Sequence, residues 1–348
     1  MSSSSHRLLT LDALRGIAAL WVCWYHFTQG NTEFLEEGWL KSSGSFGWLG
    51  VEIFFVISGF IIPYALFRSE YRTSDYGTFL LKRITRLDPP YIAGILIVII
   101  LGYISTVTPG FRGPPFQLSA TQVILHLGYA NVLFGHPWLN PVFWTLAIEL
   151  QYYLLAGLLF PALAHRSNLL RAFAFGCLGS LVFLFPNKEF LFHWLFLFMF
   201  GMAAFQFRAG IIQRGEFMCW IVVLGVGSWF AHGAVITGTG IATSLIIALY
   251  NARINTPFLF LGNISYSLYL IHIPVGSKVI NLGLRFFDTF PGRTVVLICA
   301  TAASITAAWL LYRYVELPAQ RWSSSIRYRG KQKPLPGIVS PSTESALI

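Results

Sequence analysis

Long apolar runs recur along the chain, and most approach the ~20 residues that a helix needs to cross a bilayer. The runs fall at residues 9–29, 47–67, 91–107, 142–163, 172–187, 190–207, 216–231, 234–250, 257–279 and 294–315. Residues 185–189, between two of these runs, predict a tight hairpin. The pattern predicts an all-α integral membrane protein, a polytopic bundle of about ten transmembrane helices.

A further apolar stretch at residues 119–134 is too short to span comfortably. Ser119 is a residue type that caps helices, so a helix is expected to follow it. We expect an interfacial or re-entrant helix in an external loop. A spanning segment at this point would invert the orientation of every later helix.

The composition supports a membrane protein and the charges orient it. Hydrophobic residues make up 55% of the 348 residues and charged residues 11%, whereas soluble domains carry roughly a quarter charged residues. These values exclude a soluble globule and a disordered chain. With the N-terminus inside, seventeen of the 24 Lys and Arg face the cytoplasm and six face outside. The positive-inside rule therefore predicts that both termini are cytoplasmic.

The net charge of +10 would favour nucleic acid in a soluble protein, but here it lies in loops and the C-terminal tail, so no nucleic-acid partner is expected. Residues 1–322 are predicted to form one membrane domain. Residues 323–348 read as a basic, Ser- and Pro-rich disordered cytoplasmic tail whose stretch 327–333 would lie against anionic membrane lipids. The four cysteines lie in apolar runs without metal-ligand spacing, so no metal is expected.

Ionisable residues inside spans are costly and are candidate functional groups. They are Arg15, His26, Glu52, Glu149, His193 and His272, with Lys278 near the end of a span. The predicted topology places five of them, all but Arg15 and Lys278, in the outer half of the membrane, which a purely structural scaffold would not explain. For His193 or His272 taken alone, a helix–helix hydrogen bond is the favoured interpretation.

Arg15 and His26 lie eleven residues apart in the first span, so their side chains share a helix face ~16 Å apart along the axis. They could line one cavity through much of the membrane. The alternative is that Arg15 extends separately to the inner headgroups. His26 is the candidate general base, because its unperturbed pKa is near neutrality. Glu149 would orient His26 or relay its proton.

Arg83 and Arg86 are three residues apart and could converge on one phosphate-bearing ligand. They precede Pro89 and Pro90, just before the third predicted span. Ordinary positive-inside topology explains these basic residues equally well.

Several segments, taken in order, resemble the membrane acyltransferase-3 family, which O-acylates bacterial surface polysaccharides and related molecules. The segments are 11–20, the Arg-x10-His pair Arg15 and His26, 50–62 with Glu52 and Ser58, Arg83 to Arg86, 143–153 with Trp144 and Glu149, 264–272 with Tyr266 and His272, and 316–318. The resemblance covers residues 8–322. Glu52 stands where the family often has Asp, and Asp88 where it often has an apolar or aromatic residue.

The resemblance implies an acyl-CoA donor, usually acetyl-CoA, reached from the cytoplasm, and an acceptor hydroxyl reached from outside. It implies that Arg83 and Arg86 bind the CoA phosphates and that Arg15 acts with His26 and Glu149. Glu52, Ser58, Trp144, Tyr266 and His272 become substrate-binding or supporting residues. The expected location is the bacterial cytoplasmic membrane.

The function predicted is therefore transfer of an acyl group to a hydroxyl of a cell-surface or lipid-linked saccharide. A small-molecule acceptor such as a macrolide is an alternative within the family. A transporter of a polar solute is the alternative from another class, although no internal repeat of the kind typical of transporters is evident. The acceptor, the acyl chain and the oligomeric state are left open.

Overall fold

The computed structural model describes residues 9–109, 111, 114–250 and 256–328. Each of the predicted apolar runs forms a helix. The main helices are α1 (Leu9–Gln29), α3 (Gly50–Arg68), α4 (Tyr76–Val107), α6 (Trp144–Leu163), α7 (Asn168–Leu184), α8 (Leu191–Arg208), α9 (Arg214–His232), α10 (Ala234–Leu249), α11 (Thr256–Gly283) and α12 (Phe290–Leu311). Shorter elements are α2 (Trp39–Ser42), η1 (Gly47–Leu49), η2 (Thr73–Asp75), α5 (Ala120–Leu127), η3 (Val132–Phe134), η4 (Tyr312–Glu316) and α13 (Leu317–Ser325).

Seven helices in the described part of the chain are long and apolar enough to cross a membrane. The seven candidate spans contain α3, α4, α6, α8, α9, α11 and α12, and some of them include a short neighbouring element as well. Helices α7 and α10 are apolar but shorter, and α1 carries Asp12 and Arg15. The all-helical membrane class is thus confirmed. Ten crossings and cytoplasmic termini stay predictions, and residues 1–8 and 329–348 lie outside the described residues.

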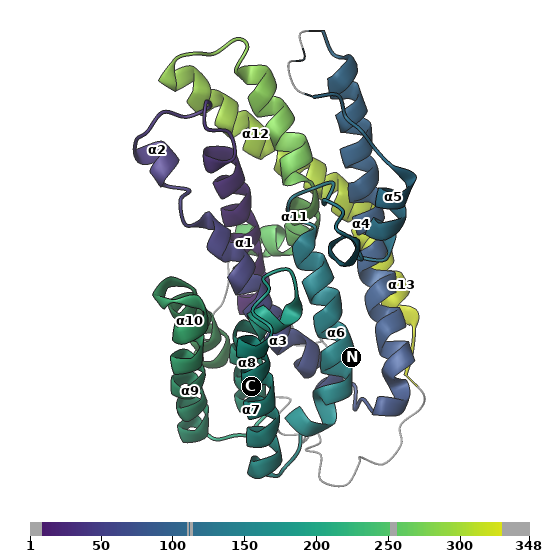
Figure 1. Ribbon diagram of the computed structural model, residues 1–348, viewed down its shortest axis with the longest axis vertical. Coiled ribbons are helices and arrows are strands. Elements are labelled where there is room, and N and C mark those ends of the chain that lie inside the picture. The colour runs from purple at the N-terminus through teal and green to yellow at the C-terminus, as the bar shows by residue number, and fades with distance from the viewer. Residues whose placement is uncertain (1–8, 110, 112–113, 251–255, 329–348) are drawn as a thin grey trace.

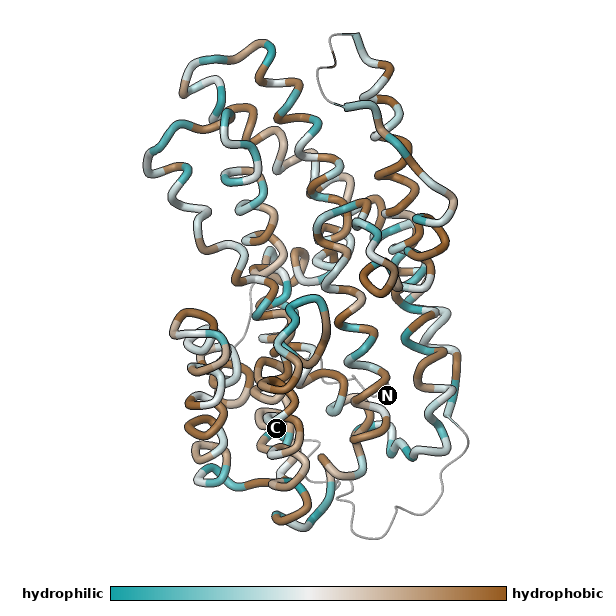
Figure 2. Tube along the Cα trace, viewed as in Figure 1, coloured by the Kyte–Doolittle hydropathy of each residue, from teal (hydrophilic) through white to brown (hydrophobic). Residues whose placement is uncertain are grey.

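The helices form two groups that meet around α3, α4 and α6. Helices α7 to α10 gather with α3 in the lower part of Figure 1, whereas α1, α11 and α12 pack together above them. Helix α4 runs along the right side of the view, with α5 beside it. Hydrophobic residues run along the helices, and much of the hydrophilic colour lies in the connections (Figure 2).

Small residues bring the central helices into backbone contact. A Cβ at Gly16 of α1 would clash with the backbone of Leu261 and Gly262 on α11, and one at Gly262 would clash with the backbone of Asp12. Close approach through small residues is a common way for helices to associate in membranes. It sets the register of α1 against α11, and so places Arg15 in the same cavity as Tyr266.

In three helices an interior proline leaves the backbone carbonyl four residues earlier without its usual N–H partner. In each case a side chain from elsewhere in the chain donates a hydrogen bond to that carbonyl. Pro63 of α3, Pro161 of α6 and Pro274 of α11 free the carbonyls of Gly59, Gly157 and Leu270. The donors are the hydroxyl of Tyr152 to Gly59 at 3.3 Å, the hydroxyl of Tyr71 to Gly157 at 2.8 Å, and the amide of Asn140 to Leu270 at 2.9 Å. Each bend is therefore fixed by tertiary structure.

Helix α4 begins earlier than its apolar run predicts. It spans 32 residues from Tyr76, so Arg83, Arg86 and both prolines lie within it. Tertiary contacts hold this first half of the helix: Lys82 Nζ donates to the carbonyls of Ser323 at 2.9 Å and Ile326 at 2.6 Å, and the hydroxyl of Ser323 donates to the carbonyl of Lys82 at 2.7 Å. The expectation that the arginines precede the helix was wrong, because docking of α13 outweighs the loss of two N–H donors.

Residues 323–328, which the sequence assigns to the tail, form the end of α13 and the segment after it, and they pack on the region of α4. Ser323 is buried, and the Tyr328 ring lies 6.3 Å from that of Tyr71 and 5.6 Å from Lys82 Nζ. The remainder of the predicted tail lies outside the described residues.

The stretch 119–134 forms the short helix α5 followed by η3. Ser119 caps α5, because its hydroxyl accepts from the N–H of Gln122 at 3.0 Å. Eight residues cannot cross a bilayer, so this helix does not invert the later ones. The loop reaches α4, where the Tyr129 hydroxyl donates to Asp88 at 3.0 Å.

Burial lowers the pKa of His126 in α5, which keeps this ring neutral.

Candidate active site

A cavity lies where α1, α3, α4, α6 and α11 meet, and its space of about 850 Å³ includes open solvent at its mouth. Its walls combine apolar side chains, such as Phe54, Ile61 and Leu146, with a few polar groups. Six of the residues predicted from sequence line it: Arg15, Ser58, Arg83, Arg86, Glu149 and Tyr266.

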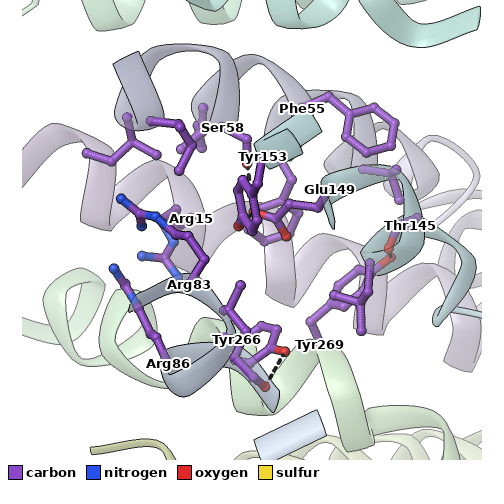
Figure 3. A pocket seen from close by; sticks show the side chains of 17 residues that line it. Arg15, Phe55, Ser58, Arg83, Arg86, Thr145, Glu149, Tyr153, Tyr266 and Tyr269 are labelled. Carbon is purple, nitrogen blue, oxygen red and sulfur yellow. Dashed lines mark hydrogen bonds between the residues drawn. The ribbon is translucent and has the colours of Figure 1, made fainter. Parts of the chain in front are cut away.

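Three arginines gather at one end of the cavity (Figure 3). Arg15 comes from α1, and Arg83 and Arg86 come from one face of α4. No salt bridge to a carboxylate is formed by any of the three within the described residues. The Arg83 guanidinium packs over the rings of Phe79 and Tyr153, at 5.5 and 5.8 Å from their centroids. This end of the cavity therefore presents strong positive charge suited to phosphate.

Glu149 lies between the arginines and the opposite end of the cavity (Figure 3). The Ser58 hydroxyl of α3 donates to its Oε1 at 3.0 Å, and the Tyr153 hydroxyl, one turn along α6, donates to the same oxygen. These hydrogen bonds fix the carboxylate inside the cavity.

The opposite end is formed by Phe55, Thr145 and Tyr269 (Figure 3). The hydroxyls of Thr145 and Tyr269 lie 2.8 Å apart and share a hydrogen bond. Tyr266 lies one turn earlier on α11 and donates its hydroxyl to the carbonyl of Leu87 at 3.0 Å. Tyr266, Tyr269 and His272 therefore follow one another along a single face of α11.

His26 and His272 form a pair next to this end. Their ring centroids are 5.2 Å apart, and the His272 ring lies 6.1 Å from that of Tyr269. His272 is completely buried, and His26 is half-buried. Neither histidine is among the residues that line the cavity. The site thus consists of an arginine-lined cavity and an adjoining histidine pair.

This combination of residues matches a known protein family. The model of the acyltransferase domain family matches residues 8–313. The chain belongs to the acyltransferase domain family. The resemblance drawn from the sequence motifs is thereby confirmed, and the protein is an acyltransferase of the membrane.

Relatives of this acyltransferase include O-acetyltransferase OatA of Staphylococcus aureus (strain NCTC 8325 / PS 47), which is 32% identical over 45% of this chain and 25% of its own. Peptidoglycan O-acetyltransferase OatA of Listeria monocytogenes serovar 1/2a (strain ATCC BAA-679 / EGD-e) is 30% identical over 42% of this chain and 23% of its own. BcsY of Komagataeibacter xylinus, assigned as a membrane-bound transacylase, is 26% identical over 81% of this chain and 76% of its own. The chain thus matches about a quarter of the length of the OatA proteins. No solved structure matches the chain.

The remaining predicted residues of the acyltransferase domain lie around the cavity wall. Trp144 packs against Phe55 and Trp194, with ring centroids 6.4 and 5.8 Å away, and so supports the wall from behind. Glu52 is 3% exposed, and its Oε2 has no hydrogen-bond partner in the described structure. The His193 ring packs against that of His232, and His232 Nε2 lies 2.7 Å from the backbone carbonyl of His193, so this hydrogen bond does not involve the His193 side chain.

The sequence linked Glu149 to His26, but the structure shows no hydrogen bond between them within its described residues. Glu149 is held by Ser58 and Tyr153, and the neighbouring ring of His26 on α11 is His272. Sequence reasoning also missed Thr145, Tyr153 and Tyr269. Helical spacing offered a signal for two of them, because Tyr153 lies four residues after Glu149 and Tyr269 three after Tyr266.

The described residues contain no group of three or more His, Cys, Asp or Glu side chains that could hold a metal ion. The polar groups of the site are instead guanidinium, carboxylate, hydroxyl and imidazole. These can bind a polyanion and transfer a proton.

Proposed function

We propose that this membrane acyltransferase moves an acetyl group from cytoplasmic acetyl-CoA to a hydroxyl of a cell-surface or lipid-linked saccharide. The observation that carries the proposal is the cluster of Arg15, Arg83 and Arg86, which form no salt bridge among the described residues and face a cavity that adjoins a histidine pair. The donor would reach the arginines from the cytoplasm. The acceptor would reach the histidines from outside.

The arginine end of the cavity suits the phosphates of CoA, because guanidinium binds phosphate through paired charge-assisted hydrogen bonds. The thioester would then lie toward Thr145 and Tyr269, among the apolar side chains of Phe54 and Phe55.

In this proposal His26 is the general base. It takes the proton from the acceptor hydroxyl as the hydroxyl oxygen bonds to the thioester carbonyl carbon. The C–S bond then breaks, and the imidazolium returns the proton to the departing sulfur. Positioned proton transfer of this kind typically contributes ~10²–10⁴-fold.

Three findings support a saccharide acceptor in a bacterial cytoplasmic membrane. The relatives from S. aureus and L. monocytogenes carry the name O-acetyltransferase, and the latter acts on peptidoglycan by its name. These relatives come from bacteria. The chain also has several helices long enough to cross a membrane.

The test is acetyl transfer by the purified full chain in lipid nanodiscs, with radiolabelled acetyl-CoA and a panel of lipid-linked saccharides. We expect Arg86→Ala to weaken acetyl-CoA binding by at least about tenfold, because a lost charge-assisted contact costs about 1.5–3 kcal/mol. His26→Ala should retain that binding and lose transfer by ~10²-fold or more.

Arg208→Ala is the matched control, because Arg208 ends α8 and does not line the cavity. It should leave donor binding unchanged. Unchanged acetyl-CoA affinity in a folded Arg86→Ala protein would contradict the donor site, and substantial transfer by folded His26→Ala would contradict the assignment of the base.

A further inference from the structure

The protonation pattern of His272 is set by its surroundings. Its Nδ1 lies 3.0 Å from the carbonyl oxygen of Leu268 and 2.9 Å from that of Tyr269. Carbonyl oxygens only accept hydrogen bonds, so Nδ1 must carry a proton. In the neutral ring Nε2 is then a bare acceptor. This nitrogen is buried and has no hydrogen-bond partner in the described structure.

His26 is the neighbour placed to donate to this nitrogen. A hydrogen bond of about 3 Å between two imidazole nitrogens puts the ring centroids about 5 Å apart, and the observed separation is 5.2 Å. The other rings beside His272 are Phe27, which has no donor, and Tyr269, whose hydroxyl is engaged with Thr145. The His26 ring is half-buried, and rotation about its side-chain bonds is the movement that this hydrogen bond would need.

The backbone around the pair is firmly held. Pro274 lies in α11 two residues after His272, and the Asn140 amide donates a hydrogen bond to the Leu270 carbonyl that the proline frees. On the next turn, a Cβ at Gly276 would clash with the Phe27 ring of α1. The two helices therefore keep a fixed register at the level of the histidines.

We propose that His272 is a positioning residue whose bare Nε2 accepts a hydrogen bond from a ring N–H of His26. This interaction fixes His26 as one neutral tautomer, with its other nitrogen bare and free to take the acceptor proton. The hydrogen bond persists when His26 becomes imidazolium, since both of its nitrogens then donate. The inference rests on the proposed role of His26 as general base.

Substitutions at His272 separate positioning from other roles. His272→Gln keeps an acceptor oxygen near the place of Nε2 but cannot act as a base at neutral pH, whereas His272→Phe keeps the ring shape and removes the acceptor. We expect His272→Phe to lower kcat by about tenfold to hundredfold, because a poorly oriented base loses part of the ~10²–10⁴-fold that general base catalysis contributes. The affinity for acetyl-CoA should be unchanged. His272→Gln should restore kcat to within about threefold of the wild type.

A readout independent of activity is the ¹⁵N spectrum of the histidine-labelled full chain in detergent, assigned with His26→Ala. In the wild type we expect His272 protonated at Nδ1 and His26 present as a single tautomer. In His272→Phe the His26 signals should become those of a tautomer mixture, and in His272→Gln one tautomer should return. The wild-type spectrum tests the pairing even if His272→Phe does not fold.

Two outcomes would overturn the inference. A tautomer mixture at His26 in the wild type would show that the hydrogen bond does not form. His272→Gln as inactive as His272→Phe, with one His26 tautomer retained, would show that His272 is itself the base. Absence of acetyl transfer by the wild type, together with the expected spectra, would instead remove the proposed function and leave the pairing established.

Discussion

Among the described residues, Glu149 is the single carboxylate that lines the cavity beside the three arginines. Its hydrogen bonds from Ser58 and Tyr153 both reach Oε1, so the carboxylate is held by α3 and by its own helix. The arginines are the positive charges nearest to it along the cavity wall (Figure 3). We therefore infer that Glu149 acts on the donor side of the reaction, independently of His26.

This assignment predicts how losses combine at the level of single residues. Glu149→Gln keeps the shape and removes the charge, so we expect acetyl transfer to fall by at least about tenfold, and His26→Ala by ~10²-fold or more. If the two contribute independently to the same rate-limiting step, their free-energy losses add, and the double variant should show the product of the two factors. Steady-state transfer rates of the two single variants and the double variant test this.

A double variant no worse than His26→Ala would instead show that the two residues act as one unit. That is the outcome expected from the sequence, where Glu149 was expected to orient His26 or relay its proton.

At the scale of elements, three of the helices that form the cavity, α3, α6 and α11, contain an interior proline whose freed carbonyl accepts a hydrogen bond from a side chain elsewhere in the chain. The Tyr71 hydroxyl donates at 2.8 Å to the Gly157 carbonyl, which Pro161 leaves without its usual N–H partner. Tyr71 precedes α4 and thus ties the start of that helix to α6. The same first half of α4 carries Arg83 and Arg86, so the position of the arginines depends on this contact.

Tyr71→Phe should therefore destabilise the protein by about 1–3 kcal/mol, because it leaves a buried carbonyl unsatisfied. Tyr76→Phe is the matched control: its hydroxyl donates to the carbonyl of Leu154 at 3.1 Å, but this carbonyl also faces the N–H of Leu158 within α6. The control should cost clearly less. Unfolding of both variants in mixed detergent micelles measures the difference, and equal losses would contradict the role given to Pro161.

At the scale of the whole molecule, two groups of helices meet at the cavity. Helices α7 to α10 pack with α3 on one side, and α1, α11 and α12 pack on the other. The arginine cavity lies where α1, α3, α4, α6 and α11 meet, and the histidine pair lies between α1 and α11. In the proposed function the donor reaches the arginines from the cytoplasm and the acceptor reaches the histidines from outside. This requires that the helices cross the membrane in the directions that the positive-inside rule predicts.

The topology can be tested directly. A reporter fused after Tyr328 keeps the docking of α13 and should report the cytoplasm. A reporter inserted at Gly135, an exposed position with a positive φ of 67° in the loop after α5, should report the outside. A cytoplasmic signal from Gly135 would show that the orientation deduced from the basic residues is wrong.

Much of this architecture is already determined by the sequence. Apolar runs of suitable length locate the helices, because a bilayer fixes both the length and the polarity of what crosses it. Spacing along one helix also places Arg83 beside Arg86, since residues three apart share a helix face. The motifs around Arg15, Glu149 and His272 indicate the acyltransferase family, which the family match over residues 8–313 confirms.

Tertiary structure alone decides which groups on different helices meet. The register of α1 against α11 depends on contact at Gly16 and Gly262, and it puts His26 beside His272, whereas Glu149 bonds to Ser58 and Tyr153. The true start of α4 depends on the docking of α13, some 240 residues away in sequence. Spacing in the sequence fixes relations within a helix, but relations between helices follow from packing and from which donor reaches each carbonyl freed by a proline.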